Sequence, residues 1–349
     1  HILADNHDKI SLDNLTRQCK VIISTVGPYL KYGQLLIQSC IENKTHYCDL
    51  TGEVPFIKES LDNFSTPAKK NNIKIIHSCG FDSIPSDIGV LFLQQNSIKT
   101  LGFPVEKIQL YVEKIRGGIS GGTIESMINI YNYVKDKPEL QKALKNPYSL
   151  AKEGAFHYPK VSSSLRNVKW DKNTMRWVCP FAMSGINTKI VRASNSLMNH
   201  YYGKNLQYSE VVSFPKGIRG YLRAWVMTLN LALVKFFLDI KPLLYILKKF
   251  ILPSPGQGPS KEKRNNGFFK MRLIGFSNEN EKLNVIIQGD SDPGYSGTAK
   301  MITESALSIV LEREKVTKKF GVLTPASGIG NIIIKRLKTK GITFQIKTK

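Results

Sequence analysis

The chain has 349 residues, of which 42% are hydrophobic and 22% charged, a composition typical of a globular protein with a full core. Its five cysteines include no C-x-x-C pair, so we predict neither a disulfide framework nor a metal site. Fifty lysines and arginines against 27 acidic residues give a formal net charge of +23, which could draw the chain to an anionic membrane or to nucleic acid. Because the lysines are dispersed and no nucleic-acid-binding signature accompanies them, composition alone also explains the charge, and we expect no nucleic-acid partner.

Residues 1–100 alternate short apolar runs with helical patterns, as in a parallel sheet covered by helices. We expect strands over residues 21–26, 46–50 and 73–78. The first of these runs has no polar alternation, so both of its faces should be covered. Ligands of such sheets lie in the crevice at the carboxyl ends of the strands. The three loops that follow these strands should therefore converge on one rim, and they are the first candidates for a functional site.

From residue 101 onward the pattern changes to longer strands with one polar face, which indicates a second α/β domain with a mixed or antiparallel sheet. Its strands are expected over residues 105–116, 208–214, 268–277 and 282–288. The later elements are expected as helices over 295–314 and 327–339 and a final strand over 342–346.

These patterns divide the chain into three parts. Residues 1–100 form an incomplete Rossmann dinucleotide-binding domain, and residues 101–295 form a substrate or dimerisation domain. Residues 296–349 are expected to pack their helices and final strand back on the Rossmann side. The predicted fold class is therefore α/β, a Rossmann-like parallel sheet with a second α/β domain.

Residues 222–252 form the most apolar stretch of the chain. Its longest uncharged run, residues 224–234, is shorter than the roughly 20 residues that span a bilayer. Pro242 should divide the stretch into two segments. It is either a pair of core helices at a dimer contact or a hairpin that dips into one leaflet or a lipid-droplet surface.

Small and polar residues follow the first three strands, where ligand contacts accumulate. In the first loop, small hydroxyls and free backbone N–H groups could face a ribose or a nicotinamide, and ordinary turns are the alternative. In the third loop, Gly80 permits close approach of the backbone. The predicted cofactor-binding residues are Ser24, Thr25, Val26, Gly27, Pro28, Asp49, Gly80 and Phe81. Asp82 and Ser83 are the catalytic candidates, as polar contacts to the reacting end of the substrate.

Four glycines within residues 117–123 (GGISGGT) indicate either a loop close to a ligand or a flexible bend after a long strand. A helix follows, and its N-terminus could hold an anion. The loop is not a Walker A motif, because no G-K-[ST] follows it.

Several of these runs together resemble the saccharopine dehydrogenase-like oxidoreductase family. The resemblance rests on motifs that occur in order along the chain, at residues 25–29 (TVGPY), 49–53 (DLTGE), 80–87 (GFDSIPSD), 256–260 (GQGPS), 292–295 (DPGY) and 321–327 (GVLTPAS). The motif at residues 80–87 (GFDSIPSD) is the most specific of these.

The resemblance implies an oxidoreductase that uses NAD or NADP and acts on a lipid-like substrate, as in the similar trans-acting enoyl reductases of glycolipid synthesis. It also implies an intracellular location on the cytoplasmic side of membranes or lipid droplets, or in mitochondria, and a homodimer is a further expectation. The alternative is a non-catalytic lipid-droplet or membrane-surface protein that retains a Rossmann-like shell.

Members of this family begin with a glycine-rich strand–turn–helix that holds the cofactor pyrophosphate. The present sequence starts at His1, and no G-x-G-x-x-G precedes the first predicted strand. We therefore expect that a first βαβ unit is missing and that the chain binds a cofactor weakly without it.

Overall fold

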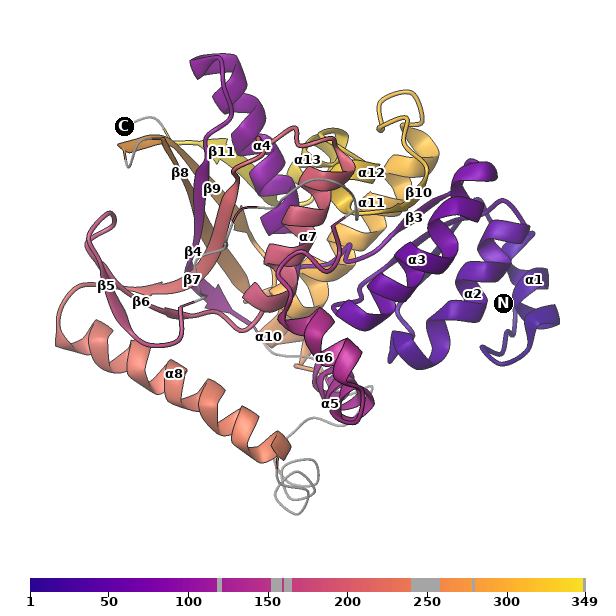
Figure 1. Ribbon diagram of the computed structural model, residues 1–349, viewed down its shortest axis with the longest axis horizontal. Coiled ribbons are helices and arrows are strands. Elements are labelled where there is room, and N and C mark those ends of the chain that lie inside the picture. The colour runs from indigo at the N-terminus through magenta and orange to yellow at the C-terminus, as the bar shows by residue number, and fades with distance from the viewer. Residues whose placement is uncertain (118–120, 152–158, 160–164, 240–257, 278–279, 348–349) are drawn as a thin grey trace.

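Two β-sheets lie on either side of a central pair of helices in the computed structural model (Figure 1). The structure describes residues 1–117, 121–151, 159, 165–239, 258–277 and 280–347. The central helices are α4 (Ile84–Leu101) and α7 (Ser184–Leu197). Because α4 contacts α7, β8 and β9, it is buried along most of its length, and the polar residues Ser86, Asp87 and Gln94 are buried with it.

The first sheet is parallel and confirms the predicted Rossmann-like arrangement. It contains β1 (Val21–Ser24), β2 (His46–Asp49), β3 (Lys74–Ile76) and β10 (Gly321–Leu323), in the order β1-β2-β3-β10. All three neighbouring pairs run parallel. Helices α1 (Lys9–Thr16), α2 (Tyr29–Glu42) and α3 (Val54–Lys70) lie on the right in Figure 1, and their apolar residues form one core with alternate residues of the four strands.

β1 is an edge strand of the described sheet, and this corrects one expectation. Ile22 is buried under α2, but Ile23 on the other face is 40% exposed. The prediction that both faces of this strand are covered is therefore wrong at Ile23. A continuous apolar run shows that both faces of a strand are apolar, but it does not show which other elements cover those faces.

The second sheet has seven strands and is mixed, as the alternating patterns predict. Its order is β11-β9-β8-β4-β7-β6-β5; β4 and β7 are parallel, and the other neighbours are antiparallel. Its strands are β4 (Lys107–Arg116), β5 (Lys169–Asp171), β6 (Arg176–Pro180), β7 (Gln207–Phe214), β8 (Phe268–Ser277), β9 (Asn280–Gly289) and β11 (Ile342–Ile346).

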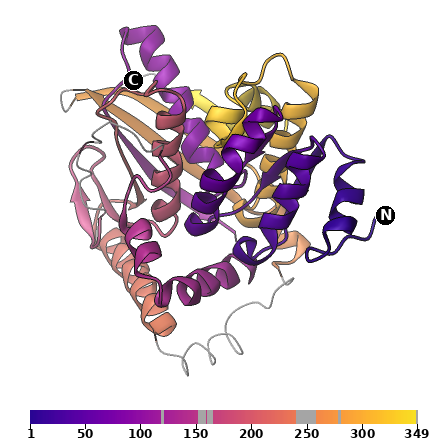
Figure 2. The same cartoon turned by 45° about the vertical axis from the view of Figure 1, so that its right-hand side comes forward.

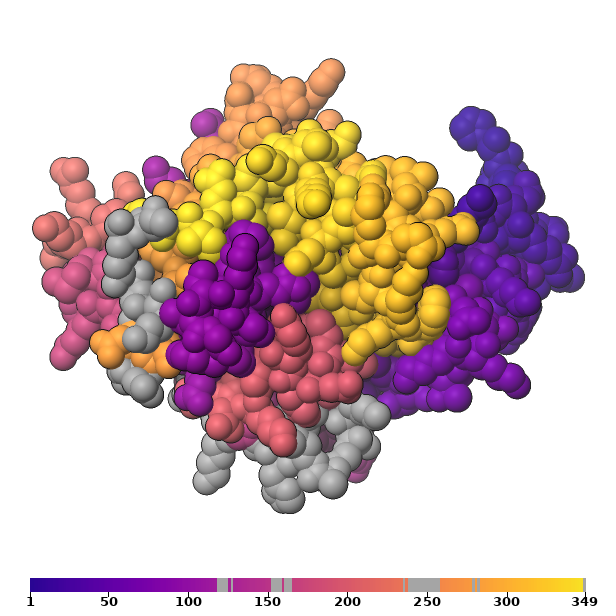
Figure 3. Space-filling model, turned by 90° about the horizontal axis from the view of Figure 1, so that it is seen from above, coloured from indigo at the N-terminus to yellow at the C-terminus, as the bar shows by residue number. Residues whose placement is uncertain are grey.

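The C-terminal segment contributes to both sheets, so only part of it lies where we expected. Helix α11 (Thr298–Leu311) contacts β1 and β2, and β10 joins the parallel sheet beside β3. After the short helices α12 (Pro325–Gly328) and α13 (Ile332–Lys338), however, β11 pairs antiparallel with β9 in the second sheet. In Figure 3 this segment, in yellow, covers the surface beside α4 and the N-terminal helices.

Helix α8 (Ile218–Asp239) lies at the periphery and contacts β6 and β7 (Figures 1 and 2). It forms the first part of the predicted apolar stretch, and the predicted break at Pro242 lies outside the described residues. Among the described residues, no helix combines the length and the apolar character needed to cross a bilayer. The remaining helices are α5 (Gly121–Lys135), α6 (Pro138–Lys145), α10 (Lys261–Asn265) and the π-helical turn η1 (Pro293–Gly297).

Candidate functional site

The loops after β1, β2 and β3 meet at the carboxyl end of the parallel sheet. The Tyr29 hydroxyl donates to the Ser24 carbonyl at 3.1 Å and accepts from the Leu50 backbone N–H at 3.3 Å. The Cys79 N–H donates to the carbonyl of Asp49 at 2.8 Å. These bonds connect all three loops, so the prediction that they share one rim is confirmed. Tyr29 ends the TVGPY motif of the first loop, but it is not among the predicted cofactor-binding residues.

Asp49 lies beneath this rim and is fully buried. One carboxylate oxygen accepts the backbone N–H groups of Thr51 and Ser78, at 3.0 and 3.1 Å. The other lies 2.7 Å from His77 Nδ1, and His77 Nε2 lies 2.8 Å from the Ser60 hydroxyl. Because both carboxylate oxygens are engaged inside the protein, the structure gives Asp49 a role in holding the second and third loops together.

Glu53 directly precedes α3, and its side chain reaches the N-terminus of α2. Its carboxylate accepts the N–H groups of Tyr29 and Leu30 at 3.0 and 2.9 Å, and the hydroxyl of Ser126 at 2.8 Å. Burial raises the pKa of this carboxyl group. These N–H groups have no partner within their own helix and would otherwise attract a phosphate. A protein carboxylate therefore fills this anion position.

The surface of the rim consists of Thr25, Val26 and Gly27, which are exposed, and the Val26 side chain is 47% exposed. The other predicted cofactor-binding residues are buried: Ser24, Pro28, Asp49, Gly80 and Phe81. The structure therefore brings the predicted set together but leaves only its first loop open to a ligand.

Gly80 is required by packing against the protein itself. A Cβ atom at this position would lie 2.9 Å from Leu50 Cδ2 and 3.2 Å from Thr298 Cγ2. The Phe81 N–H donates to the Thr298 hydroxyl at 3.0 Å, and the Phe81 ring packs edge-on against Phe269, with 5.0 Å between centroids. The third loop is thus fixed against η1 and α11 and against the second sheet.

Ser83 belongs to a buried polar network that joins the start of α4 and helix α7 to β7 of the second sheet. Its hydroxyl donates to Asn187 Oδ1 at 3.2 Å, and Asn187 Nδ2 donates to Glu210 at 3.0 Å. Glu210 also accepts the hydroxyls of Ser86 and Tyr208, at 2.6 and 2.7 Å. Sequence reasoning missed Asn187 and Glu210, which lie in ordinary helix and strand patterns far from any motif.

Asp82 differs from its neighbour because its side chain is partly exposed. Burial, and to a smaller extent the nearby charge of Glu210, raises the pKa of Asp82 to about 6. No hydrogen-bond donor to this carboxylate is found among the described residues. Of the two catalytic candidates, Asp82 is thus the one able to contact a ligand.

The glycine-rich segment 117–123 lies partly outside the described residues, which omit 118–120. At Gly117 a Cβ atom would collide with the side chain of Asp292, next to the DPGY turn. This glycine therefore allows a close contact within the protein.

A parallel sheet with crossover helices, joined to a second mixed sheet, places this chain in the class of Rossmann-like α/β proteins. No family model matches it. A protein of Mycobacterium tuberculosis provisionally named a trans-acting enoyl reductase is 30% identical over 353 residues, covering 99% of this chain and 84% of that protein. The trans-acting enoyl reductase of Mycobacterium bovis is 28% identical over 354 residues, with 98% and 84% covered.

Among solved structures, apo saccharopine dehydrogenase (L-Glu forming) from Saccharomyces cerevisiae shares the fold, with a TM-score of 0.50 and 14% identity over 99% of this chain and 88% of that one. The chain belongs to the saccharopine dehydrogenase-like oxidoreductase family, together with the trans-acting enoyl reductases. The family assignment makes it an oxidoreductase.

Proposed function

We propose that this protein is an NAD(P)-linked oxidoreductase that reduces a carbon–carbon double bond in a lipid-like substrate. The observation that carries the proposal is the shared rim at the carboxyl ends of the parallel strands, where dinucleotides bind in this class of sheet. The name of the Mycobacterium tuberculosis relative supports an enoyl group as the part of the substrate that is reduced. A nicotinamide cofactor, when bound, supplies the hydride.

The described residues suit one part of such a cofactor. Thr25, Val26 and Gly27 offer a hydroxyl, an apolar side chain and exposed backbone to a flat ring or a ribose. The N-terminus of α2 does not suit the pyrophosphate, because Glu53 already accepts its free N–H groups. The proposal therefore assigns the nicotinamide half of the cofactor to this rim.

Asp82 is proposed to contact the reacting end of the substrate. Asp82 is partly exposed, and burial raises the pKa of its carboxyl group to about 6, so in its protonated form it can donate a hydrogen bond that polarises a substrate carbonyl. Ser83 is a positioning residue, because it reaches Glu210 through Asn187 and fixes the start of α4.

Fluorescence titration of the protein with NADH and NADPH tests the proposal. We expect saturable binding of one nucleotide, and we expect Val26→Asp to weaken it at least about tenfold because the substitution replaces an apolar contact to the nicotinamide ring with a charge. Ile10→Asp is the matched control, since Ile10 is 73% exposed on α1, and it should bind as the wild type does. Absence of binding at millimolar nucleotide, or equal affinity of Val26→Asp, would contradict the proposal.

We propose as a second function that α8 binds an anionic lipid surface. The helix exposes large apolar side chains, of which Ile218 is 71%, Val226 59% and Leu229 57% exposed. An apolar groove of about 820 Å³ runs beside it. The sequence has no acidic residue between Glu210 and Asp239, whereas lysine or arginine stands at positions 216, 219, 223 and 235. Exposed apolar side chains with neighbouring cations are typical of helices that lie in a membrane interface.

Sedimentation with vesicles tests this second function. Binding to vesicles that contain phosphatidylserine should exceed binding to pure phosphatidylcholine, and salt should weaken it. The double variant Val226→Glu, Leu229→Glu should lose most of this binding, whereas Ile10→Glu should not. Unchanged sedimentation of the double variant would refute the role of α8, and it would leave the nucleotide titration unaffected.

A further inference from the structure

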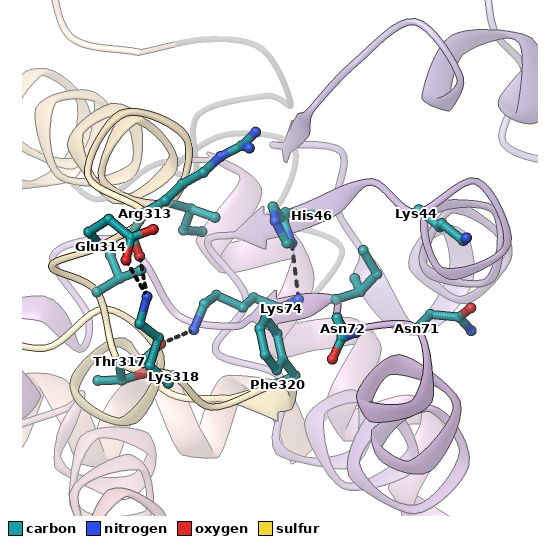
Figure 4. Close-up of a pocket in the computed structure, with 13 residues that line it drawn as sticks. Lys44, His46, Asn71, Asn72, Lys74, Arg313, Glu314, Thr317, Lys318 and Phe320 are labelled. Atoms are coloured by element: carbon teal, nitrogen blue, oxygen red, sulfur yellow. Dashed lines mark hydrogen bonds and ion pairs between the residues drawn. The ribbon is translucent and has the colours of Figure 1, made fainter.

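A pocket of about 390 Å³ opens at the amino end of the parallel sheet, opposite to the rim (Figure 4). Its walls are the loops that precede three strands, with residues 44–46 before and in β2, 71–74 before and in β3, and 313–320 before β10. Pockets of this size accommodate small ligands. The proposed function does not use this pocket.

The charge of the pocket is positive. The described side chains that line it include one acid, Glu314, and four cations: Lys44, Lys74, Arg313 and Lys318. Glu314 is neutralised by Lys318 at 2.8 Å, so the remaining cations are not balanced within the described lining. Arg313 and Lys44 are exposed, and their side chains have no hydrogen-bond or ion-pair partner among the described residues.

Lys74 has a structural role in this pocket. It is 3% exposed, and its ammonium group donates to the carbonyls of Thr317 and Lys319 at 2.6 Å each and of Gly328 at 3.1 Å. It also lies 5.1 Å from the centre of the Phe320 ring. These contacts fix the 317–320 wall, so the pocket is formed before any ligand enters.

His46 supplies a directed donor. Its Nδ1 accepts the backbone N–H of Lys74 at 3.1 Å, so in the neutral ring the proton resides on Nε2. Burial, followed by the charges of Lys74 and Arg313, lowers the pKa of His46 to about 4, which keeps the ring neutral at pH 7. No described group accepts the Nε2–H. In Figure 4 the ring lies between Arg313 and Lys74.

We propose that this pocket binds a small phosphate ester, with the Arg313 guanidinium and the His46 Nε2–H as donors to the phosphate. Arg313 can bind phosphate oxygens in a two-pronged geometry, and His46 adds a neutral donor beside it. Ile309, Val316 and Phe320 line the same pocket and offer contacts to the organic part. Lys44 stands apart on the other side in Figure 4 and adds long-range charge.

The alternative is that these cationic side chains have only a structural role and bind no ligand. In this sheet, helices end at the amino ends of the strands, and their free carbonyl groups attract lysines. That account suffices for Lys74, which three carbonyls bind. It does not explain Arg313, which binds none of the described carbonyls, or the donor on His46.

NMR and calorimetric titration with phenyl phosphate tests the proposal, with inorganic phosphate and phenol as partial probes. Phenyl phosphate should bind at millimolar or lower concentration and should move the His46 ring signals in a saturable way. Inorganic phosphate should bind more weakly, and phenol should not bind. The bound anion should also raise the measured pKa of His46, because it opposes the nearby positive charges.

Two variants distinguish direct binding of the phosphate by Arg313 from nonspecific electrostatic attraction. Arg313→Ala should weaken phenyl phosphate binding about tenfold, and Lys44→Ala about threefold, because only Arg313 is a direct donor. Arg116→Ala, an exposed arginine on β4 outside this pocket, should bind as the wild type does. Equal affinity of Arg313→Ala and wild type, or His46 signals that do not move, would overturn the proposal. Nucleotide binding at Val26 should be unchanged in Arg313→Ala, so the two proposals fail independently.

Discussion

The two ends of the parallel sheet carry opposite charges, and the direction of the backbone explains why. At the carboxyl end helices begin, and their free N–H groups need acceptors. Glu53 accepts the first N–H groups of α2, from Tyr29 and Leu30, and Asp87 accepts the Ala326 N–H of α12 at 2.8 Å. Buried carboxylates therefore accumulate at this end.

At the amino end helices and loops present carbonyl groups instead, and these bind the ammonium of Lys74. The comparison distinguishes charged side chains that are bound within the protein from charged side chains that could bind a ligand. At the carboxyl end Asp49 and Glu53 bind groups of the protein itself, and the exposed part of the rim consists of the uncharged residues Thr25, Val26 and Gly27, with Asp82 partly exposed. The amino end leaves Arg313 and Lys44 without described partners, so a ligand of opposite charge can bind there.

The largest effect is expected from removing a structural charge at the carboxyl end. Asp49→Ala should lower the free energy of unfolding by about 3 kcal/mol, because it leaves His77 and two buried N–H groups without their acceptor. Chemical denaturation measures the loss. Asp49→Asn keeps one acceptor oxygen and should lose about half as much. A loss in Asp49→Ala similar to that of a surface substitution would mean that this carboxylate does not hold the loops.

Asp87 should make stability depend on pH. Burial raises its pKa to about 7, well above the usual range of an aspartate, so between these values the folded state holds a proton that the unfolded state releases. Between pH 4 and 7 the stability should therefore fall as the pH rises, by at most about 1.4 kcal/mol per pH unit. Denaturation at several pH values measures the slope, and Asp87→Asn should flatten it. A slope that Asp87→Asn does not change would assign the pH dependence to another group.

At the same end of the sheet, Asp82 is proposed to contact a ligand, whereas Asp49 and Asp87 bind groups of the protein. Asp82→Asn should lower kcat about tenfold or more with little change in stability, because none of the described residues donates a hydrogen bond to it. If Asp82 acts in its protonated form, wild-type activity should fall as the pH rises through about 6, the value to which its pKa is raised. An unchanged kcat in Asp82→Asn would remove this residue from the proposed mechanism.

The smallest effect is expected at the amino end. Lys44 is exposed and has a φ of +57°, a conformation that favours glycine. Lys44→Gly should therefore change the stability by no more than about 0.5 kcal/mol, while weakening phenyl phosphate binding only a few-fold. Thermal unfolding and calorimetry measure the two effects. A large loss of stability would show that this lysine is structural, like Lys74.

The sequence predicted the parallel strands, their shared rim and the mixed second sheet, because β-rich runs and crossover spacing are local signals. It could not predict that Glu53 reaches across to α2, or that both oxygens of Asp49 are bound inside the protein. These contacts depend on how separate loops pack. The pocket at Arg313 was equally hidden, since its walls come from loops separated by up to about 270 positions in the chain and no motif joins them.

The strand placement of the C-terminal segment also escaped prediction, for a related reason. Only the short helices α12 and α13 separate β10, in one sheet, from β11, in the other. This connection is short, so it allows little movement of one sheet relative to the other. Any hinge-like separation of the two sheets must bend these helices or strip β11 from β9, so we expect the two halves to melt in a single cooperative transition and to resist proteolytic separation.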